Sequence, residues 1–174
     1  MTLMDPSKTR RSAIAGLSAS AVLLVSLATS EGWSDRAIVP TKGDRPTVGF
    51  GSTFRDDGSP VKMGDTITPP KALARTLAFI QKDEHGIKQC VTAPLTQVEY
   101  DTMVDFSYQY GVKALCASTI VREANQGHYA ASCRGYLLYK RAAGYDCSTP
   151  GNHRCPGVWA RSQARYRKCI GGAP

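Results

Sequence analysis

The stretch GDRPTVGFGST, residues 43–53, decides the class of fold. Its glycines and prolines favour turns, and the β-branched and aromatic residues within 47–50 favour a strand. The surrounding region, residues 31–70, is rich in Gly, Pro, Asp and Thr, and Asp57-Gly58 is a further turn signal. We therefore expect a small sheet or hairpin in this part of the chain.

Beyond this region the hydrophobic residues follow a helical spacing. Leu73, Leu77 and Ile80 recur on one helical face. Thr96 and Glu99 match the capping-box pattern, which predicts that a further helix begins there. The second part of the chain is therefore expected to be helical, and the fold class to be α+β with more helix than sheet.

A last predicted helix has one apolar and one basic face. Its apolar positions are Trp159, Tyr166 and Ile170, and its basic positions are Arg161, Arg165, Arg167 and Lys168. A basic helix face is usually solvated, although on a cationic protein it could also hold the molecule against an acidic surface.

Length and composition restrict the class of protein. The chain has 174 residues, of which 42% are hydrophobic and 21% charged, and this composition excludes disordered, collagen-like and polytopic membrane proteins. One domain, or a small domain with a tail, is the expected size. The formal net charge of +8 favours a polyanionic partner, which need not be nucleic acid.

The amino terminus has the features of an export signal. Lys8, Arg10 and Arg11 precede an uncharged run over 12–30, which approaches the roughly 20 residues of a membrane span. Many of its residues are alanine or serine, so its partition into lipid is expected to be marginal. We predict a basic cytoplasmic tail (1–11), a weakly hydrophobic segment (12–30) and export of the rest. The alternative is a cleavable signal peptide with a small-residue site at 28–30.

The cysteines agree with export. All six lie in the second half of the chain: Cys90, Cys116, Cys133, Cys147, Cys155 and Cys169. An even number without paired C-x-x-C motifs predicts three disulfides in an oxidising compartment. Cys147 and Cys155 bracket a compact loop and are expected to pair, whereas the other four allow three pairings. His153 lacks the further ligands of a zinc finger, so neither metal nor cofactor is predicted.

Carboxylates near the predicted strand are candidates for chemistry. Cleavage of a glycosidic bond uses one carboxylic acid to protonate the leaving oxygen and a second carboxylate on the other side of the sugar. Glu31 and Asp44 supply such a pair close to the hydroxyl of Thr47. Asp35 is the alternative second carboxylate, but a helix continuing past Glu31 would place both acids on one face.

Several motifs resemble one enzyme family in the same order along the chain. Glu31-Gly32 followed by residues 43–53 resembles the active-site signature of the phage-type lysozymes, the glycoside hydrolase family of the T-even phage lysozyme. Pro94-Leu95-Thr96-Gln97 is similar to its interlobe helix, and residues 157–162 with Arg165 are similar to its C-terminal helix. The resemblance extends over nearly all of residues 31–169.

The resemblance implies both a fold and a set of roles. The fold would be lysozyme-like over 31–174, with a small β lobe (31–70), a helical lobe (71–174) and the active site between them. Glu31 would be the general acid, Asp44 the second carboxylate and Thr47 the hydroxyl that orients the attacking water. The reaction would hydrolyse the β-1,4 bond between N-acetylmuramic acid and N-acetylglucosamine, with inversion. The loop before Thr47 differs in length from that of the best-known members.

Together with its weakly hydrophobic start, the chain resembles the signal-anchor-release endolysins. This implies peptidoglycan as substrate and host cell lysis. The cell wall is then the expected polyanionic partner in place of nucleic acid, and we expect a monomer. The catalytic domain would be tethered in the periplasm through residues 12–30 in the inner membrane, inactive until release, and soluble there afterwards. The 12–30 segment contains no cysteine, which excludes restraint by thiol exchange with it. The alternatives are a lytic transglycosylase and a non-catalytic cationic wall-binding protein.

Overall fold

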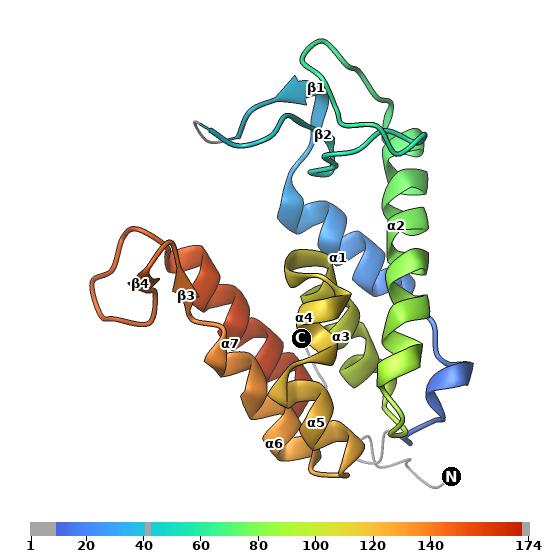
Figure 1. Ribbon diagram of the computed structural model, residues 1–174, viewed down its shortest axis with the longest axis vertical. Helices are drawn as coiled ribbons and strands as arrows, with labels where there is room; N and C mark the ends of the chain where they lie inside the picture. The colour runs from blue at the N-terminus through green and yellow to red at the C-terminus, as the bar shows by residue number, and fades with distance from the viewer. Residues whose placement is uncertain (1–9, 41–42, 172–174) are drawn as a thin grey trace, which may run out of the picture. The chain divides into compact units, whose positions relative to one another are not determined.

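A computed structural model describes residues 10–40 and 43–171, and for Glu31 it describes the backbone only (Figure 1). Within these residues it has seven α-helices and two small antiparallel sheets, which confirms the predicted mainly helical α+β class. In chain order the elements are η1 (Ile14–Gly16), α1 (Ala21–Glu31), β1 (Ser34–Ile38), β2 (Thr47–Gly49), α2 (Pro69–Cys90), α3 (Gln97–Tyr110), α4 (Val112–Cys116), α5 (Thr119–Asn125), α6 (Tyr129–Gly135), η2 (Tyr136–Leu138), β3 (Arg141–Ala142), β4 (Tyr145–Asp146) and α7 (Pro156–Gly171).

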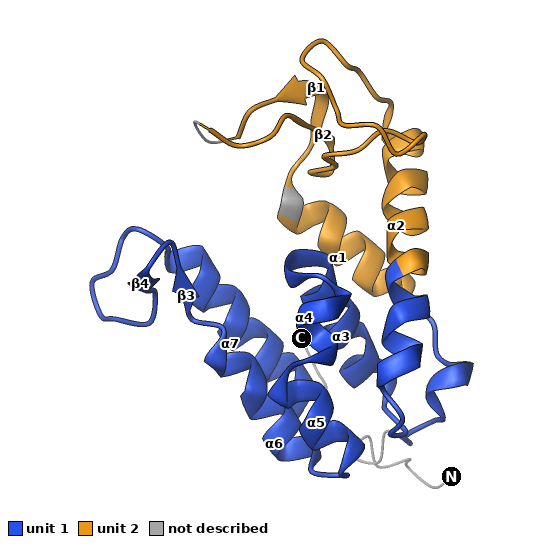
Figure 2. Ribbon diagram, viewed as in Figure 1, with its two compact units in different colours: residues 1–18, 83–174 blue, residues 19–82 orange. Residues whose placement is uncertain are grey.

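The chain forms two compact units (Figure 2). The smaller unit is residues 19–82, and the larger unit is made of residues 1–18 and 83–174, of which residues 1–9 and 172–174 lie outside the described part. These boundaries differ from those of the predicted lobes, 31–70 and 71–174. Helix α1 and the first turns of α2 belong with the small sheet, and the 12–30 segment is divided between the units.

The smaller unit is built around the β1–β2 pair. Ser34 is opposite Gly49 and Ile38 is opposite Thr47, with an irregularity between these positions. The strand predicted within 47–50 is therefore confirmed. The apolar cluster that packs around this pair of strands contains Ala37, Val48, Val61, Ile67 and Ala72. The backbone of Gly49 has a φ of 70°, and a Cβ there would lie 2.9 Å from Cβ of Ala72. Only glycine allows the sheet and α2 to approach this closely.

The buried face of α2 is not the one that the leucines mark. Ala72, Thr76 and Ile80 are buried, whereas Leu73 and Leu77 are 38% and 40% exposed. Positions 72, 76 and 80 follow one another at a spacing of four, so they form a stripe of their own on the helix. A small alanine is preferred at 72 because the sheet backbone comes so close there.

The larger unit confirms the predicted start of α3. Oγ1 of Thr96 accepts a hydrogen bond from the Glu99 amide at 3.1 Å, and Oε2 of Glu99 accepts one from the Thr96 amide at 2.8 Å. This reciprocal pair satisfies two amides at the helix start. The same glutamate binds Arg11, whose Nη2 and Nε donate at 2.6 and 3.1 Å. Residues near the amino terminus are thus attached to the folded helical unit.

All six cysteines are paired, and every pair lies in the larger unit. Cys147 is bonded to Cys155, as predicted from the short loop between them. The pairing that the sequence left open is Cys90 with Cys116 and Cys133 with Cys169. Three crosslinks over this region restrict its unfolded state and stabilise the fold.

One residue of the predicted basic face of α7 is buried instead. The side chain of Arg165 is 4% exposed, and its Nε donates to Oδ2 of Asp105 at 2.7 Å. Its guanidinium carbon also lies 5.8 Å from the centroid of the Phe106 ring and 5.7 Å from that of Tyr110. The interpretation of Arg165 as solvated was therefore wrong, because a carboxylate and aromatic rings of α3 compensate its burial.

In the described part of the chain, no helix combines the length and apolar character that crossing a membrane requires.

Candidate active site

Glu31 is the last residue of α1, and Gly32 ends that helix. Gly32 has φ 74° and ψ 178°, a backbone conformation that side chains with a Cβ rarely adopt. The chain then enters β1 at Ser34. The side chain of Glu31 lies outside the described part of the structure, so its position is given by the helix end alone.

Thr47 begins β2, and Asp44 precedes it in the β1–β2 connection. Thr47 is half-buried and is opposite Ile38, whereas Asp44 is exposed. Three residues span at most about 10 Å, so the structure keeps the two side chains in one short segment. Among the described residues, no hydrogen bond or ion pair engages the Asp44 carboxylate. A carboxylate open in this way remains available to a water molecule or a substrate.

The antiparallel pairing returns the chain to the strand that carries Thr47. Because Ser34 is opposite Gly49, the segment that follows Glu31 runs beside the strand that contains Thr47. The backbone therefore brings the three predicted site residues, Glu31, Asp44 and Thr47, into one helix–hairpin arrangement within the smaller unit.

Asp35 does not extend the helix that carries Glu31. It lies within β1, and its carbonyl oxygen accepts a hydrogen bond from the Ile67 amide at 2.9 Å. The condition under which Asp35 would share a helical face with Glu31 is therefore not met, because Gly32 changes the backbone direction first.

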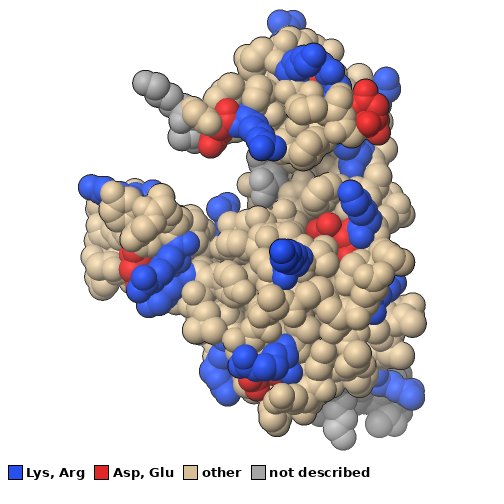
Figure 3. All heavy atoms as spheres, in the orientation of Figure 1, with Lys and Arg blue, Asp and Glu red and all other residues tan. Residues whose placement is uncertain are grey.

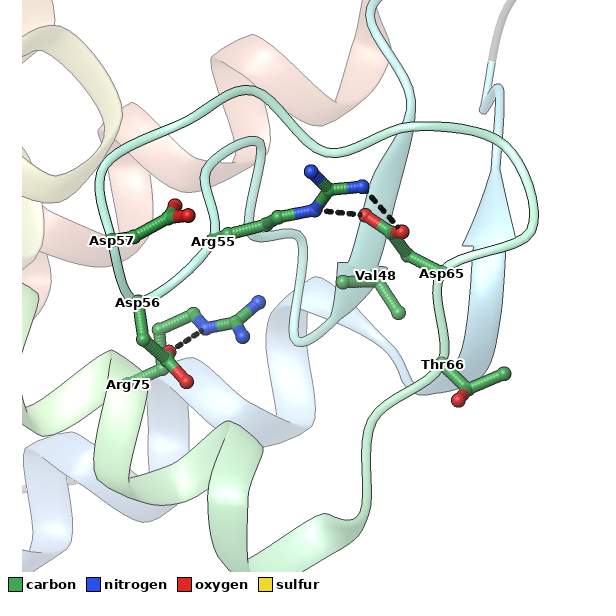
Figure 4. Close-up of a pocket in the computed structure, with 7 residues that line it drawn as sticks. All are labelled: Val48, Arg55, Asp56, Asp57, Asp65, Thr66 and Arg75. Carbon is green, nitrogen blue, oxygen red and sulfur yellow. Dashed lines mark hydrogen bonds and ion pairs between the residues drawn. The ribbon is translucent and has the colours of Figure 1, made fainter.

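Sequence reasoning missed a cluster of charged side chains between β2 and α2. Arg55 and Asp65 form a bidentate ion pair, and Arg75 pairs with Asp56 (Figure 4). The pKa of Asp65 falls to about 2 because the Arg55 guanidinium and the Lys62 amide donate hydrogen bonds to it. No periodicity in the sequence joins these partners, which are 10 and 19 residues apart.

Positive charge on the visible face of the molecule is dispersed. Figure 3 shows Lys and Arg side chains in small separate groups, several of them beside Asp or Glu, and no continuous stripe on that face. Among the described residues, no three His, Cys, Asp or Glu side chains form a group that could hold a metal ion.

The comparisons with known proteins agree with this arrangement. The family model of the phage lysozymes matches residues 28–165, which include the end of α1, the small sheet and most of α7. The fold is that of an endolysin from Escherichia coli O157:H7 phage FAHEc1, with a TM-score of 0.78 and 23% identity over 94% of this chain and 98% of that one.

Two further comparisons involve Salmonella phage P22. The P22 endolysin is 35% identical over 97 residues, which are 56% of this chain and 66% of that protein. A crystal structure of a point mutant of P22 lysozyme has a TM-score of 0.73 and 28% identity, and covers 89% of this chain and 99% of its own. The chain belongs to the phage lysozyme family. It is accordingly a peptidoglycan-lysing enzyme.

Proposed function

We propose that the chain is a muramidase, an endolysin that hydrolyses the β-1,4 bond between N-acetylmuramic acid and N-acetylglucosamine in host cell lysis. The observation that carries this proposal is the family match over residues 28–165, because it contains Glu31, Asp44 and Thr47 in one stretch. The helix–hairpin arrangement of the backbone around these residues supports it.

The proposed roles follow from what each group can do. Glu31 protonates the leaving oxygen, which requires a carboxylic acid that keeps its proton until the bond breaks. Asp44 accepts a proton from the attacking water, and its exposed position before β2 suits contact with solvent. The hydroxyl of Thr47 both donates and accepts, so it orients that water without itself attacking the sugar.

The products test this function against its enzymatic rival. A muramidase adds water and therefore leaves a reducing N-acetylmuramic acid end on each fragment. A lytic transglycosylase closes an anhydro ring and adds no water. We expect mass spectrometry of digested peptidoglycan to find reducing ends only. Fragments with anhydro ends, lighter by one water, would show that the proposal of hydrolysis is wrong.

Replacing Asp44 by Asn is expected to lower the hydrolysis rate about a hundredfold, because the amide cannot accept a proton from water. Asp35→Asn is the matched variant, since it removes an exposed carboxylate of the same unit from the neighbouring strand. It should retain nearly all activity. The measurement is release of reducing sugar from purified peptidoglycan at equal protein concentration. A loss confined to Asp35→Asn would transfer the role of second carboxylate to Asp35.

We further propose that residues 12–30 tether the protein to the inner membrane before release, with the catalytic domain in the periplasm. In the structure this segment is part of the fold. Ser12 exchanges two backbone hydrogen bonds with Leu95, at 2.8 and 2.9 Å, and Leu23 and Leu27 of α1 are buried. The neighbouring valines Val22 and Val25 are 79% and 64% exposed. Helix α1 thus has apolar side chains on more than one face, which suits both the lipid bilayer and the folded protein.

The 12–30 segment cannot occupy the bilayer and its place in the fold together. A Ser12 inside the bilayer cannot pair with Leu95, and a buried Leu27 cannot face lipid at the same time. Because Glu31 ends α1, membrane residence of 12–30 would displace it from Asp44 and Thr47. Release would let α1 join the smaller unit and complete the active site. The protein would then be a soluble periplasmic monomer.

Leucine at three polar or small positions should trap the tethered form. Gly16, Ser18 and Ser30 are exposed in the folded protein, so Gly16→Leu, Ser18→Leu and Ser30→Leu together fit the fold while making the segment more apolar. We expect at least about tenfold more protein in the membrane fraction, with slower lysis. The control carries Asn at the same three positions. Lysis by the leucine variant as fast as by wild type would contradict restraint by the membrane.

A further inference from the structure

A cavity lies in the smaller unit, and its lining does not include Glu31, Asp44 or Thr47. Its volume is about 340 Å³, and it opens over the loop between β2 and α2 (Figure 4). We call it the charged basin, and its lining residues are Val48, Arg55, Asp56, Asp57, Asp65, Thr66 and Arg75. Five of these seven side chains are charged, and the proposed glycosidic chemistry uses none of them.

Two ion pairs hold the walls of the charged basin in place. Nε and Nη2 of Arg55 donate to the two oxygens of Asp65, both at 2.7 Å, and this planar pairing fixes the loop around them. Nε of Arg75, on α2, donates to Oδ1 of Asp56 at 2.6 Å. The loop is thus attached both to itself and to a helix, so the basin exists before any ligand binds.

Arg75 retains unused donors inside the basin. Its side chain is 17% exposed, and among the described residues its terminal nitrogens Nη1 and Nη2 have no hydrogen-bond partner. Figure 4 shows the guanidinium projecting from Asp56 toward the middle of the basin. Two parallel N–H groups on one guanidinium match the two oxygens of a carboxylate.

Asp57 supplies the complementary charge. A hydrogen bond from the Ser59 side chain, together with the one that the Ser59 amide donates to Oδ1 at 2.8 Å, holds the pKa of its carboxyl below the usual value. Among the described residues no cationic side chain forms an ion pair with it. The pairs Arg55–Asp65 and Arg75–Asp56 each cancel in charge, so the basin retains one uncompensated negative charge, that of Asp57.

We propose that the charged basin binds the zwitterionic end of an amino acid, with its α-carboxylate on Nη1 and Nη2 of Arg75 and its α-ammonium at Asp57. Stem peptides of the cell wall present this group where a diamino acid is joined through one end only, so that its other ammonium and carboxylate remain free. The inference that the ligand comes from the cell wall rests on the proposed muramidase function, whereas the charge complementarity of the basin is independent of that function.

The position of the basin suits a stem attached to a bound glycan. Val48 lines the basin and directly follows Thr47 in β2. Neighbouring residues of a strand point to opposite faces, and their Cα atoms are about 3.8 Å apart. Three residues of stem peptide extend about 10 Å, which is enough to pass around one strand from the Thr47 side to the basin.

The test uses three small probes and no hydrolysis. These are a tripeptide ending in a diamino acid with free terminal ammonium and carboxylate, the same peptide N-acetylated on that ammonium, and the same peptide amidated on that carboxylate. Heteronuclear NMR titration of the wild-type protein should shift the Arg75 Nε–H and the Ser59 amide signals with the free peptide. Each blocked peptide should bind about tenfold more weakly.

Two conservative variants assign the contacts. Asp57→Asn keeps the acceptor for the Ser59 amide and removes only the charge, so it should bind the free and N-acetylated peptides equally. Arg75→Lys keeps a cation for Asp56 but loses the two parallel donors, so it should bind the free and amidated peptides equally. Lys82→Gln removes a positive charge about 10 Å further along α2 and should bind as wild type does.

Three results would overturn the proposal. They are the absence of NMR shifts at the basin, equal binding of all three peptides to wild type, and equal losses of affinity for the free peptide in Lys82→Gln and Arg75→Lys. If Asp57→Asn or Arg75→Lys fails to fold, the blocked peptides on wild type still decide the question. Failure of the muramidase proposal is detected separately, by peptidoglycan fragments without reducing ends. A protein that binds the free peptide but produces no such ends would retain the basin and lose the proposed reaction.

Discussion

Glu31→Gln should reduce peptidoglycan hydrolysis about a thousandfold. Glutamine has the size and shape of glutamate, and it can still form hydrogen bonds, but its amide is too weak an acid to give a proton to the leaving oxygen. General acids contribute roughly 10²–10⁴-fold in rate, and departure of a sugar oxygen without protonation is especially slow. The measurement is loss of turbidity in permeabilised Gram-negative cells, together with release of reducing sugar from purified wall.

The same variant separates catalysis from wall binding. A cationic wall-binding protein without chemistry would act through its charge, and Glu31→Gln raises that charge by one unit. This rival therefore predicts unchanged or faster clearing of the cells. Sedimentation with purified peptidoglycan should show that the variant still binds. Glu123→Gln, on α5 in the larger unit, is the charge-matched control and should lyse cells as wild type does.

Local signals were the ones that sequence reasoning could interpret. The strand at Thr47, the capping box at Thr96 and the disulfide between Cys147 and Cys155 each depend on residues close together in the chain. Their backbone preferences act before tertiary contacts form, so a single sequence contains enough information to predict them.

Features determined by distant partners were missed or misread. Leu73 and Leu77 are apolar, yet the buried stripe of α2 begins at Ala72 because the backbone at Gly49 leaves room only for a methyl group. No residue near position 72 in the sequence indicates that Gly49 packs against Ala72 in the fold. The pairing of Cys90 with Cys116 is similar, since it depends on how α2 and α4 pack.

The candidate site and the charged basin also differ in whether local sequence signals could predict them. Glu31, Asp44 and Thr47 could be proposed from carboxylate chemistry and family motifs, because those residues lie within one short stretch. The charged basin could not be proposed in this way, because in the sequence its loop residues resemble the surface charges of any polar loop. These residues are Arg55, Asp56, Asp57 and Asp65. Only the fold brings Arg75 to Asp56 and leaves two of its donors directed into a cavity.

The two units are stabilised by different means. The larger unit has three disulfides, whereas the smaller one has none among its described residues and depends on a small apolar core and on ion pairs such as Arg55–Asp65. Ion pairs near the surface add little to the free energy of unfolding and are screened by salt, even where a bidentate pair such as Arg55–Asp65 fixes the geometry of a loop. A unit held in this way opens more easily, which agrees with the proposal that α1 joins it only after release from the membrane.

The buried ion pair of the larger unit should respond unequally to loss of either partner. Arg165 is 4% exposed, whereas Asp105 is 24% exposed and so retains some contact with water. Asp105→Asn leaves a guanidinium buried without its counter-charge and should cost about 3–5 kcal/mol of unfolding free energy. Arg165→Met leaves a carboxylate that water can still reach, and its apolar side chain packs against Phe106 and Tyr110. Its cost should therefore be smaller.

Thermal unfolding under oxidising conditions measures this difference. Asp105→Asn should lower the midpoint by roughly 10 °C, and Arg165→Met by less. The double variant Asp105→Leu with Arg165→Met should recover part of the loss, because it leaves no buried charge. Arg122→Gln, which removes an arginine that is 61% exposed, should change the midpoint little. If Arg165→Met cost as much as Asp105→Asn, the packing of the arginine rather than its uncompensated charge would be what stabilises α7 against α3.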